Sequence, residues 1–131
     1  MSSSFRDLRV WQEAIDLAME IYHGTASFPK QEIYGLAQQM RRAAVSIPSN
    51  IAEGHGRLDD GHFRQFLAIS RGSLYELQTQ LELTADLKYL DGARIHELIE
   101  QSYEVARMIN GLLASIARDG SIPRQADSAT R

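Results

Sequence analysis

Apolar residues recur at steps of three and four along most of the chain, which is the spacing typical of amphipathic α-helices. Four segments show this period, and short polar stretches separate them. The residues expected to face the core are, segment by segment, Leu8, Trp11, Ile15, Ala18 and Tyr22; Ile33, Leu36, Met40, Ala44, Ile47 and Ile51; Phe63, Leu67, Ser70, Leu74, Leu77, Leu81 and Ala85; and Ile95, Leu98, Ser102, Val105, Ile109, Leu112 and Ile116. Four helices with short connections predict an all-α fold, an antiparallel up-down four-helix bundle.

Helix-breaking and helix-capping residues place the ends of these segments. Pro48 lies inside the second segment, but the apolar phase continues through it, so we predict one kinked helix there rather than two. Residues 1–118 are expected to form the bundle, and the polar residues 119–131, which lose the period, are expected to be a disordered tail. The residues expected to end or cap helices are Gly24, Pro29, Gly54, Gly56, Asp59 or Asp60, Asp91, Asp119 and Gly120.

The third segment carries a second, separate row of residues on the side opposite its core row. We call this row the outer seam, and its members are Gln65, Ile69, Gly72, Glu76, Leu83 and Leu87. Three large aliphatic side chains and a glycine are unusual on a solvent-facing side, and exposed apolar clusters mark partner surfaces. The sequence therefore predicts that this segment forms the contact between copies of a homo-oligomer.

The first segment is ambiguous because its apolar arc covers about half of a helical wheel. Val10, Ala14, Leu17 and Ile21 lie beside the expected core row. These four residues either widen the core or form a further contact surface, and the sequence leaves both readings open.

Composition narrows the class of protein. The chain has 131 residues, a formal net charge of −3 and no cysteine, which excludes disulfide scaffolds, Cys-liganded zinc and thiol catalysis. No apolar run reaches the length that spans a bilayer, and the start lacks the apolar core of a secretory signal. We therefore expect a cytoplasmic protein without a membrane partner.

Candidate catalytic and metal chemistry is weak. Glu20 and His23 have the Glu-x-x-His spacing of di-iron bundles, but Glu20 projects about 140° from Ile15 on the wheel and is expected to face water. Ser46 and the other serines lack a nucleophile elbow, and their hydroxyls are expected to bond carbonyls that Pro48 leaves free. The expectation is a protein that is no enzyme and holds no cofactor or metal.

Charge is distributed unevenly along the chain. Residues 41–71 carry five arginines against three acids, whereas residues 76–104 carry seven acids against two bases. Arginine suits bidentate contact with phosphate, and a homo-oligomer would repeat the basic surface. The candidate nucleic-acid-binding residues are Arg41, Arg42, Arg57, Arg64 and Arg71. The alternative is that these arginines pair with acids and serve structure.

Two stretches are too distinctive for a generic bundle. Residues 39–54 read Gln-Met-Arg-Arg-Ala-Ala-Val-Ser-Ile-Pro-Ser-Asn-Ile-Ala-Glu-Gly, and residues 66–81 read Phe-Leu-Ala-Ile-Ser-Arg-Gly-Ser-Leu-Tyr-Glu-Leu-Gln-Thr-Gln-Leu. Together with Leu8-Arg9-Val10-Trp11, they resemble the four-helix bundle family named for intervening sequences in bacterial large-subunit ribosomal RNA genes. The resemblance covers about residues 5–117, and Gly61-His62 departs from the Lys-Glu that members often have there.

The resemblance implies a ring-like homopentamer with no established enzymatic activity or cofactor. A similar retroelement accessory protein binds nucleic acid and a protein partner through basic surfaces. The resemblance thus implies a non-enzymatic homopentamer with RNA or DNA as a partner. The alternative that stays open is an assembly or scaffold protein that acts through protein–protein contacts, with structural arginines and no nucleic acid.

Overall fold

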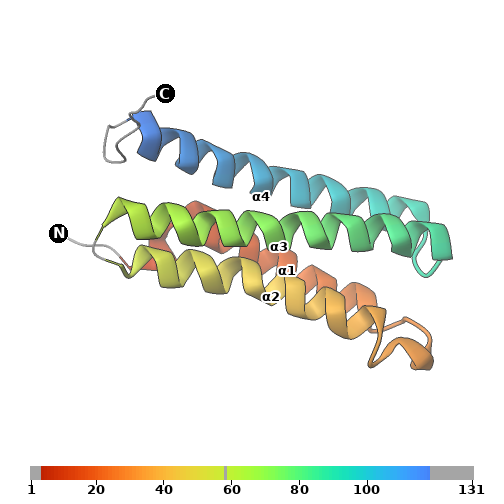
Figure 1. Ribbon diagram of the computed structural model, residues 1–131. Helices are drawn as coiled ribbons and strands as arrows, with labels where there is room; N and C mark the ends of the chain where they lie inside the picture. The colour runs from red at the N-terminus through yellow and green to blue at the C-terminus, as the bar shows by residue number, and fades with distance from the viewer. Residues whose placement is uncertain (1–3, 58, 119–131) are drawn as a thin grey trace.

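The computed structural model describes residues 4–57 and 59–118, which form four α-helices lying side by side (Figure 1). The helices are α1 (Arg9–Thr25), α2 (Leu36–His55), α3 (Asp60–Leu87) and α4 (Gly92–Arg118). Short 3-10 turns, η1 (Phe5–Asp7) and η2 (Lys30–Glu32), precede α1 and α2. This part of the chain contains no strand, so the predicted all-α class with four helices is confirmed.

Contacts between α2 and α3 run in opposite numerical order. Met40 of α2 lies against Thr84 of α3, and Ser46 Oγ of α2 lies 2.8 Å from Ser73 Oγ of α3. Each helix packs against two others: α1 against α2 and α4, and α3 against α2 and α4. Within the described residues α1 and α3 make no close contact, so they lie diagonally across the bundle.

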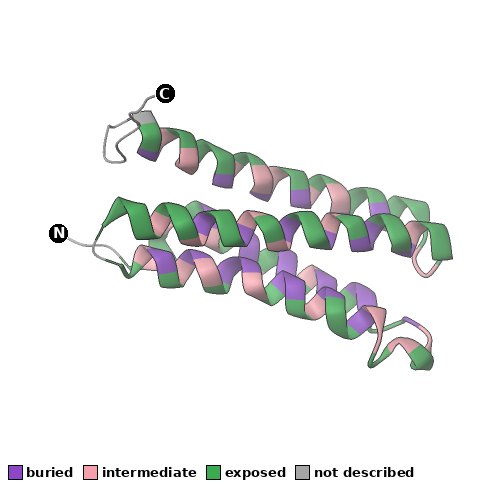
Figure 2. Cartoon of the chain, viewed as in Figure 1, coloured by how far each residue is buried: buried purple, intermediate pink, exposed green. Residues whose placement is uncertain are grey.

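The core rows predicted for α3 and α4 are the buried ones (Figure 2). Phe63 and Ala85 at the ends of the α3 row and Leu112 near the end of the α4 row are half-buried, and the other members are buried. In both helices the apolar residues lie on one narrow side at regular spacing, so that side is the one that packs into the core.

The core row predicted for α1 is only partly right. Ala18 is buried, and Leu8 and Trp11 pack against the core, but Ile15 is half-buried and Tyr22 is 43% exposed. The other buried apolar side chains of α1 are those of the neighbouring row, Val10, Ala14, Leu17 and Ile21. The reason is that α1 packs against both α2 and α4, so the middle of its wide apolar arc faces the core.

One prediction for the second segment also fails. Ile33 is 55% exposed, because it follows η2 and precedes the start of α2 at Leu36. The predicted helix end at Gly54 and Gly56 is confirmed, since α2 ends at His55 with Gly56 as its C-cap and Gly54 buried in its last turn. The prediction of one helix through Pro48 is confirmed, since α2 is continuous from Leu36 to His55.

The predicted caps of the last two helices are confirmed. Asp59 Oδ1 accepts a hydrogen bond from the His62 N–H at 2.8 Å, and Asp91 Oδ1 accepts one from the Arg94 N–H at 2.9 Å. Lys88 ends α3 in the left-handed conformation, with φ 60°. The predicted tail, residues 119–131, lies outside the described residues. None of the described helices combines the length and the apolar character that crossing a membrane requires.

Candidate nucleic-acid and assembly surfaces

The five candidate arginines lie in separate groups. Arg41 and Arg42 line a hollow beside α1 and α2. Arg64 and Arg71 line a different hollow of about 390 Å³, between α3 and α4, whose other walls include Gly61, Gln65, Ala68 and Leu113. Arg57 follows the end of α2. A single copy therefore presents two arginine pairs and one isolated arginine.

Arg41 is held by the C-terminal end of α1. Its Nε donates to Thr25 Oγ1 at 2.8 Å, and its Nη2 donates to the Tyr22 carbonyl at 3.2 Å. Its guanidinium carbon also lies 4.7 Å from the centre of the Tyr22 ring. A cation that bonds the last carbonyls of a helix complements the helix dipole, so Arg41 ties α2 to the end of α1.

Arg57 and Arg71 also have partners within the chain. Arg57 pairs with Glu53 at 2.9 Å, and its guanidinium carbon lies 5.0 Å from the centre of the Phe66 ring. Arg71 Nη1 donates to Asn110 Oδ1 at 2.8 Å. The Arg71 contact is neutral, so its positive charge is retained beside Arg64.

Arg42 and Arg64 differ from the other three. Both side chains are exposed, and neither makes a hydrogen bond or ion pair with the described part of the chain. Arg64 stands seven residues before Arg71, so the two lie on the same side of α3. The hollow between α3 and α4 therefore carries two positive charges. Within the described part of the chain, all hydrogen-bond donors of the Arg64 guanidinium are free.

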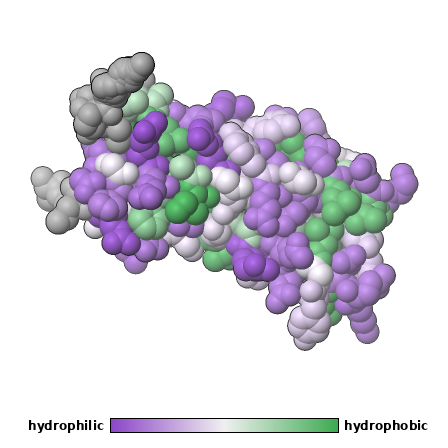
Figure 3. All heavy atoms as spheres, viewed as in Figure 1, coloured by the Kyte–Doolittle hydropathy of each residue, from purple (hydrophilic) through white to green (hydrophobic). Residues whose placement is uncertain are grey.

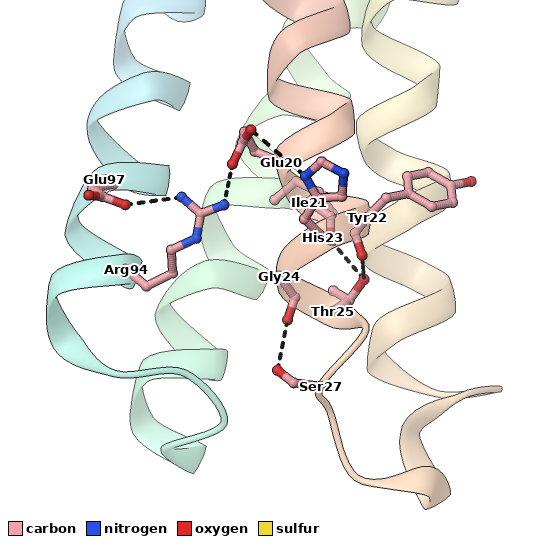
Figure 4. Close-up of polar contacts among 9 residues, drawn as sticks. All are labelled: Glu20, Ile21, Tyr22, His23, Gly24, Thr25, Ser27, Arg94 and Glu97. Atoms are coloured by element: carbon pink, nitrogen blue, oxygen red, sulfur yellow. Dashed lines mark hydrogen bonds and ion pairs between the residues drawn. The ribbon is translucent and has the colours of Figure 1, made fainter.

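Arg94 forms an ion-pair cluster that sequence analysis missed (Figure 4). It reaches from α4 to Glu20 of α1, and it also pairs with Glu97 at 3.0 Å. The hydrogen bond to Glu20 raises the pKa of Arg94, although burial opposes this. Glu20 thus binds a neighbouring helix, which corrects the prediction that it only faces water. No local signal indicates this contact, because its partners come from the first and last helices.

Several serines and one histidine make hydrogen bonds within a helix, at its cap or between helices. Ser70 Oγ donates to the Ile47 carbonyl at 2.7 Å, and Ser49 Oγ donates to the Val45 carbonyl at 2.8 Å. His62 Nδ1 lies 2.7 Å from Asp59 Oδ2. The pKa of Asp59 is lowered, first by the His62 N–H and then by the His62 ring. No group of three or more metal-ligating side chains converges among residues 4–57 and 59–118.

The outer seam lies on the surface of the single chain. Ile69 and Leu83 are each 47% exposed and Leu87 is 43% exposed. Gly72 is exposed, and a Cβ built on it would meet no atom within 4 Å. Figure 3, in which α3 faces the viewer, shows apolar side chains gathered in two groups along this helix, with polar ones between them. A row of exposed aliphatic side chains of this kind is expected where one protein surface contacts another.

Comparisons with known proteins gave a family match and matches among solved structures. The chain is similar to the family described as 23S rRNA-intervening sequence protein, whose profile matches residues 6–111. It is also similar in fold to a Bacteroides thetaiotaomicron protein of unknown function from the S23 ribosomal protein family, with a TM-score of 0.72 and 20% identity. That alignment covers 79% of this chain and 97% of the other. No curated protein matches the chain.

Proposed function

The chain belongs to the family of 23S rRNA-intervening sequence proteins, and on that premise we propose that it is a non-enzymatic, cytoplasmic homopentamer that binds RNA or DNA. Each copy would be an antiparallel up-down bundle, and the copies would form a ring through the outer seam. The reversed order of contacts between α2 and α3 supports the antiparallel arrangement. The exposure of Ile69, Leu83 and Leu87 supports the assembly.

One observation carries the nucleic-acid proposal: Arg64 and Arg71 line the same hollow, and no acid pairs with either of them in the described part of the chain. Two guanidinium groups one heptad apart can each contact a phosphate, and a ring would repeat this pair in every copy. The remaining candidates Arg41, Arg42 and Arg57 lie apart from this pair, and the proposal does not require them to contact nucleic acid.

The test is an electrophoretic binding assay with single-stranded RNA and double-stranded DNA. Micromolar protein should retain one of the probes at about 50 mM salt and release it as salt rises, because phosphate contacts displace counterions. Replacing Arg64 and Arg71 together by Gln should weaken retention and reduce the salt slope by about two, one for each lost phosphate contact. Absence of retention at low salt would overturn the nucleic-acid part of the proposal.

Arg41→Gln is the matched control, and it also tests the second candidate function. Its donors bond Thr25 and Tyr22, so this variant should lower the melting temperature and leave retention unchanged. The second candidate, a scaffold protein that binds another protein, is favoured by the in-chain partners of Arg41, Arg57 and Arg71. It predicts that the Arg64 and Arg71 variant behaves like the wild type in every nucleic-acid assay.

A further inference from the structure

A second apolar surface lies between α1 and α2, away from the outer seam. Phe5, Trp11 and Ile15 form one wall, and Val45, Pro48 and Ala52 form the other. We call this hollow, with a volume of about 280 Å³, the α1–α2 groove. Its lining is mostly apolar, and Val45 is 42% exposed in it.

The groove continues into a basic hollow. Val45 lines both, and the second hollow adds Ile33 and Arg42. Arg42 is exposed and has no ion-pair partner in the described part of the chain. A groove that is lined by apolar residues and ends at an unpaired arginine is complementary to a row of apolar residues that contains an unpaired carboxylate.

The outer seam has that composition. Glu76 lies between Gly72 and Leu83. Among the described residues its one polar contact is a 3.4 Å hydrogen bond from Gln80 Nε2, so no cation pairs with it there. The groove borders α1, and α3 does not contact α1 within the described residues. One copy therefore cannot cover its own groove with its own seam, but a neighbouring copy can.

The two surfaces also match in height along the bundle. Ser46 of α2 and Ser73 of α3 lie side by side, and residue numbers run in opposite order along these helices. Because each residue adds the same rise, counting from the Ser46–Ser73 pair places Arg42 near Glu76 and Pro48 near Gly72, whereas counting from the Met40–Thr84 pair places Arg42 nearer Glu82. A rotation about an axis parallel to the helices keeps these levels. It therefore brings the stretch of α3 between Glu76 and Glu82 to Arg42, and of these two acids only Glu76 belongs to the seam.

We infer that the outer seam of one copy docks into the α1–α2 groove of the next copy, with Glu76 facing Arg42. This rests on the proposed assembly and names the receiving surface. The contact joins two different surfaces, so it is heterologous and closes into a ring when the rotation permits. It places Arg42 in the contact between copies. Arg64 and Arg71 are not members of the seam, and only Gln65 of the seam borders their hollow.

A mixing experiment tests the inference. Ile69→Glu with Leu83→Glu disables the seam, and Val45→Glu disables the groove; all three positions are exposed in the single chain. Each variant alone should be a folded monomer by circular dichroism and sedimentation. Mixed together, they should form a one-to-one heterodimer, because the mixture keeps one intact seam and one intact groove. The controls, Met19→Glu and Tyr103→Glu, alter exposed apolar residues elsewhere and should assemble normally.

The outcomes separate this inference from the proposed assembly. A wild-type chain that sediments as a monomer would overturn both. Wild-type oligomers that persist in Val45→Glu, or variants that do not associate when mixed, would overturn the groove and leave the proposed oligomer standing.

A charge exchange provides an independent readout. Arg42→Glu or Glu76→Arg should each raise the dissociation constant of the assembly on the order of tenfold or more, because like charges then face each other. The chain carrying both changes should regain its affinity. Glu82→Arg, an exposed acid of α3 outside the seam, should have little effect. Failure of the double variant to recover would rule out the Arg42–Glu76 contact.

Discussion

At the residue scale, Gly54 shows what a local signal cannot reveal. Glycine disfavours helix, so the sequence predicts the helix end at Gly54 and Gly56, where α2 does end, but it gives no sign that Gly54 itself is buried in the last turn. A Cβ on Gly54 would lie 2.6 Å from Phe66 Cβ and 3.1 Å from Phe63 Cδ1 of α3. The glycine is therefore required by the close approach of another helix, and the residues that require it lie in a different segment.

Gly54→Ala is expected to destabilise the chain by about 1–3 kcal/mol, because the added methyl group forces the two aromatic rings or the helices to move. Gly111→Ala is the matched control, since nothing lies within 4 Å of its Cβ position. That substitution should stabilise the chain by roughly 0.5–1 kcal/mol through helix propensity. Urea unfolding of both variants gives the free energies of unfolding, and equal effects would contradict the packing argument.

At the scale of the element, α2 begins with an unusual cap. Gly35 provides no side chain, and Glu32 Oε1 instead accepts a hydrogen bond from the Leu36 N–H at 3.0 Å. Glu32 Oε2 accepts a second bond from the Tyr89 hydroxyl at 2.8 Å. The backbone bond, and then the tyrosine, lower the pKa of Glu32 below its ordinary value, and the same contact raises the pKa of Tyr89.

Glu32→Gln should therefore change how stability depends on pH. The pKa of Glu32 is lower in the folded chain, so its stabilising effect is complete above the ordinary value near 4.5 and is lost as the pH falls through the lowered value. The variant should be less stable than the wild type at neutral pH, and the difference should shrink in acid.

Denaturant unfolding at a series of pH values measures this difference. Glu100→Gln is the control, since that exposed glutamate of α4 makes no hydrogen bond with the described residues. A gap between Glu32→Gln and wild type that stays constant into strong acid would refute the role of the ionised carboxylate.

Helix periodicity predicts whole elements well where the apolar stripe is narrow. It identifies the buried faces of α3 and α4. It is only partly right for α1, where apolar residues cover about half of the wheel. The spacing does not show whether Tyr22 or Ile21 is buried, because this depends on how α1 packs against α2 and α4 together. Caps such as Asp59 and Asp91 are predictable because their bonds are local.

At the scale of the whole molecule, the candidate surfaces are only partly predictable. Spacing alone places Arg64 and Arg71 on one side of α3, which agrees with the hollow they share. It does not reveal that Arg41 bonds the end of α1 or that Glu20 binds Arg94, because these partners come from other helices. Charge counted along a chain therefore does not show which charged side chains are already engaged in contacts between helices.

The last prediction concerns the coupling of assembly to binding. If a ring presents one pair of Arg64 and Arg71 per copy, a long RNA can contact several pairs at once, and its affinity gains from effective concentration by a factor of about 10² or more. The monomeric variant Ile69→Glu with Leu83→Glu keeps both arginines. This variant should lose that gain in affinity on a long RNA. It should bind a short RNA, which cannot reach a second copy, about as tightly as the wild type does.

Met19→Glu with Tyr103→Glu is the control, because it adds the same two negative charges at exposed positions outside the seam. It therefore distinguishes the effect of lost assembly from the repulsion between added carboxylates and the RNA. Equal binding of the long RNA by monomer and oligomer would mean that each copy acts alone.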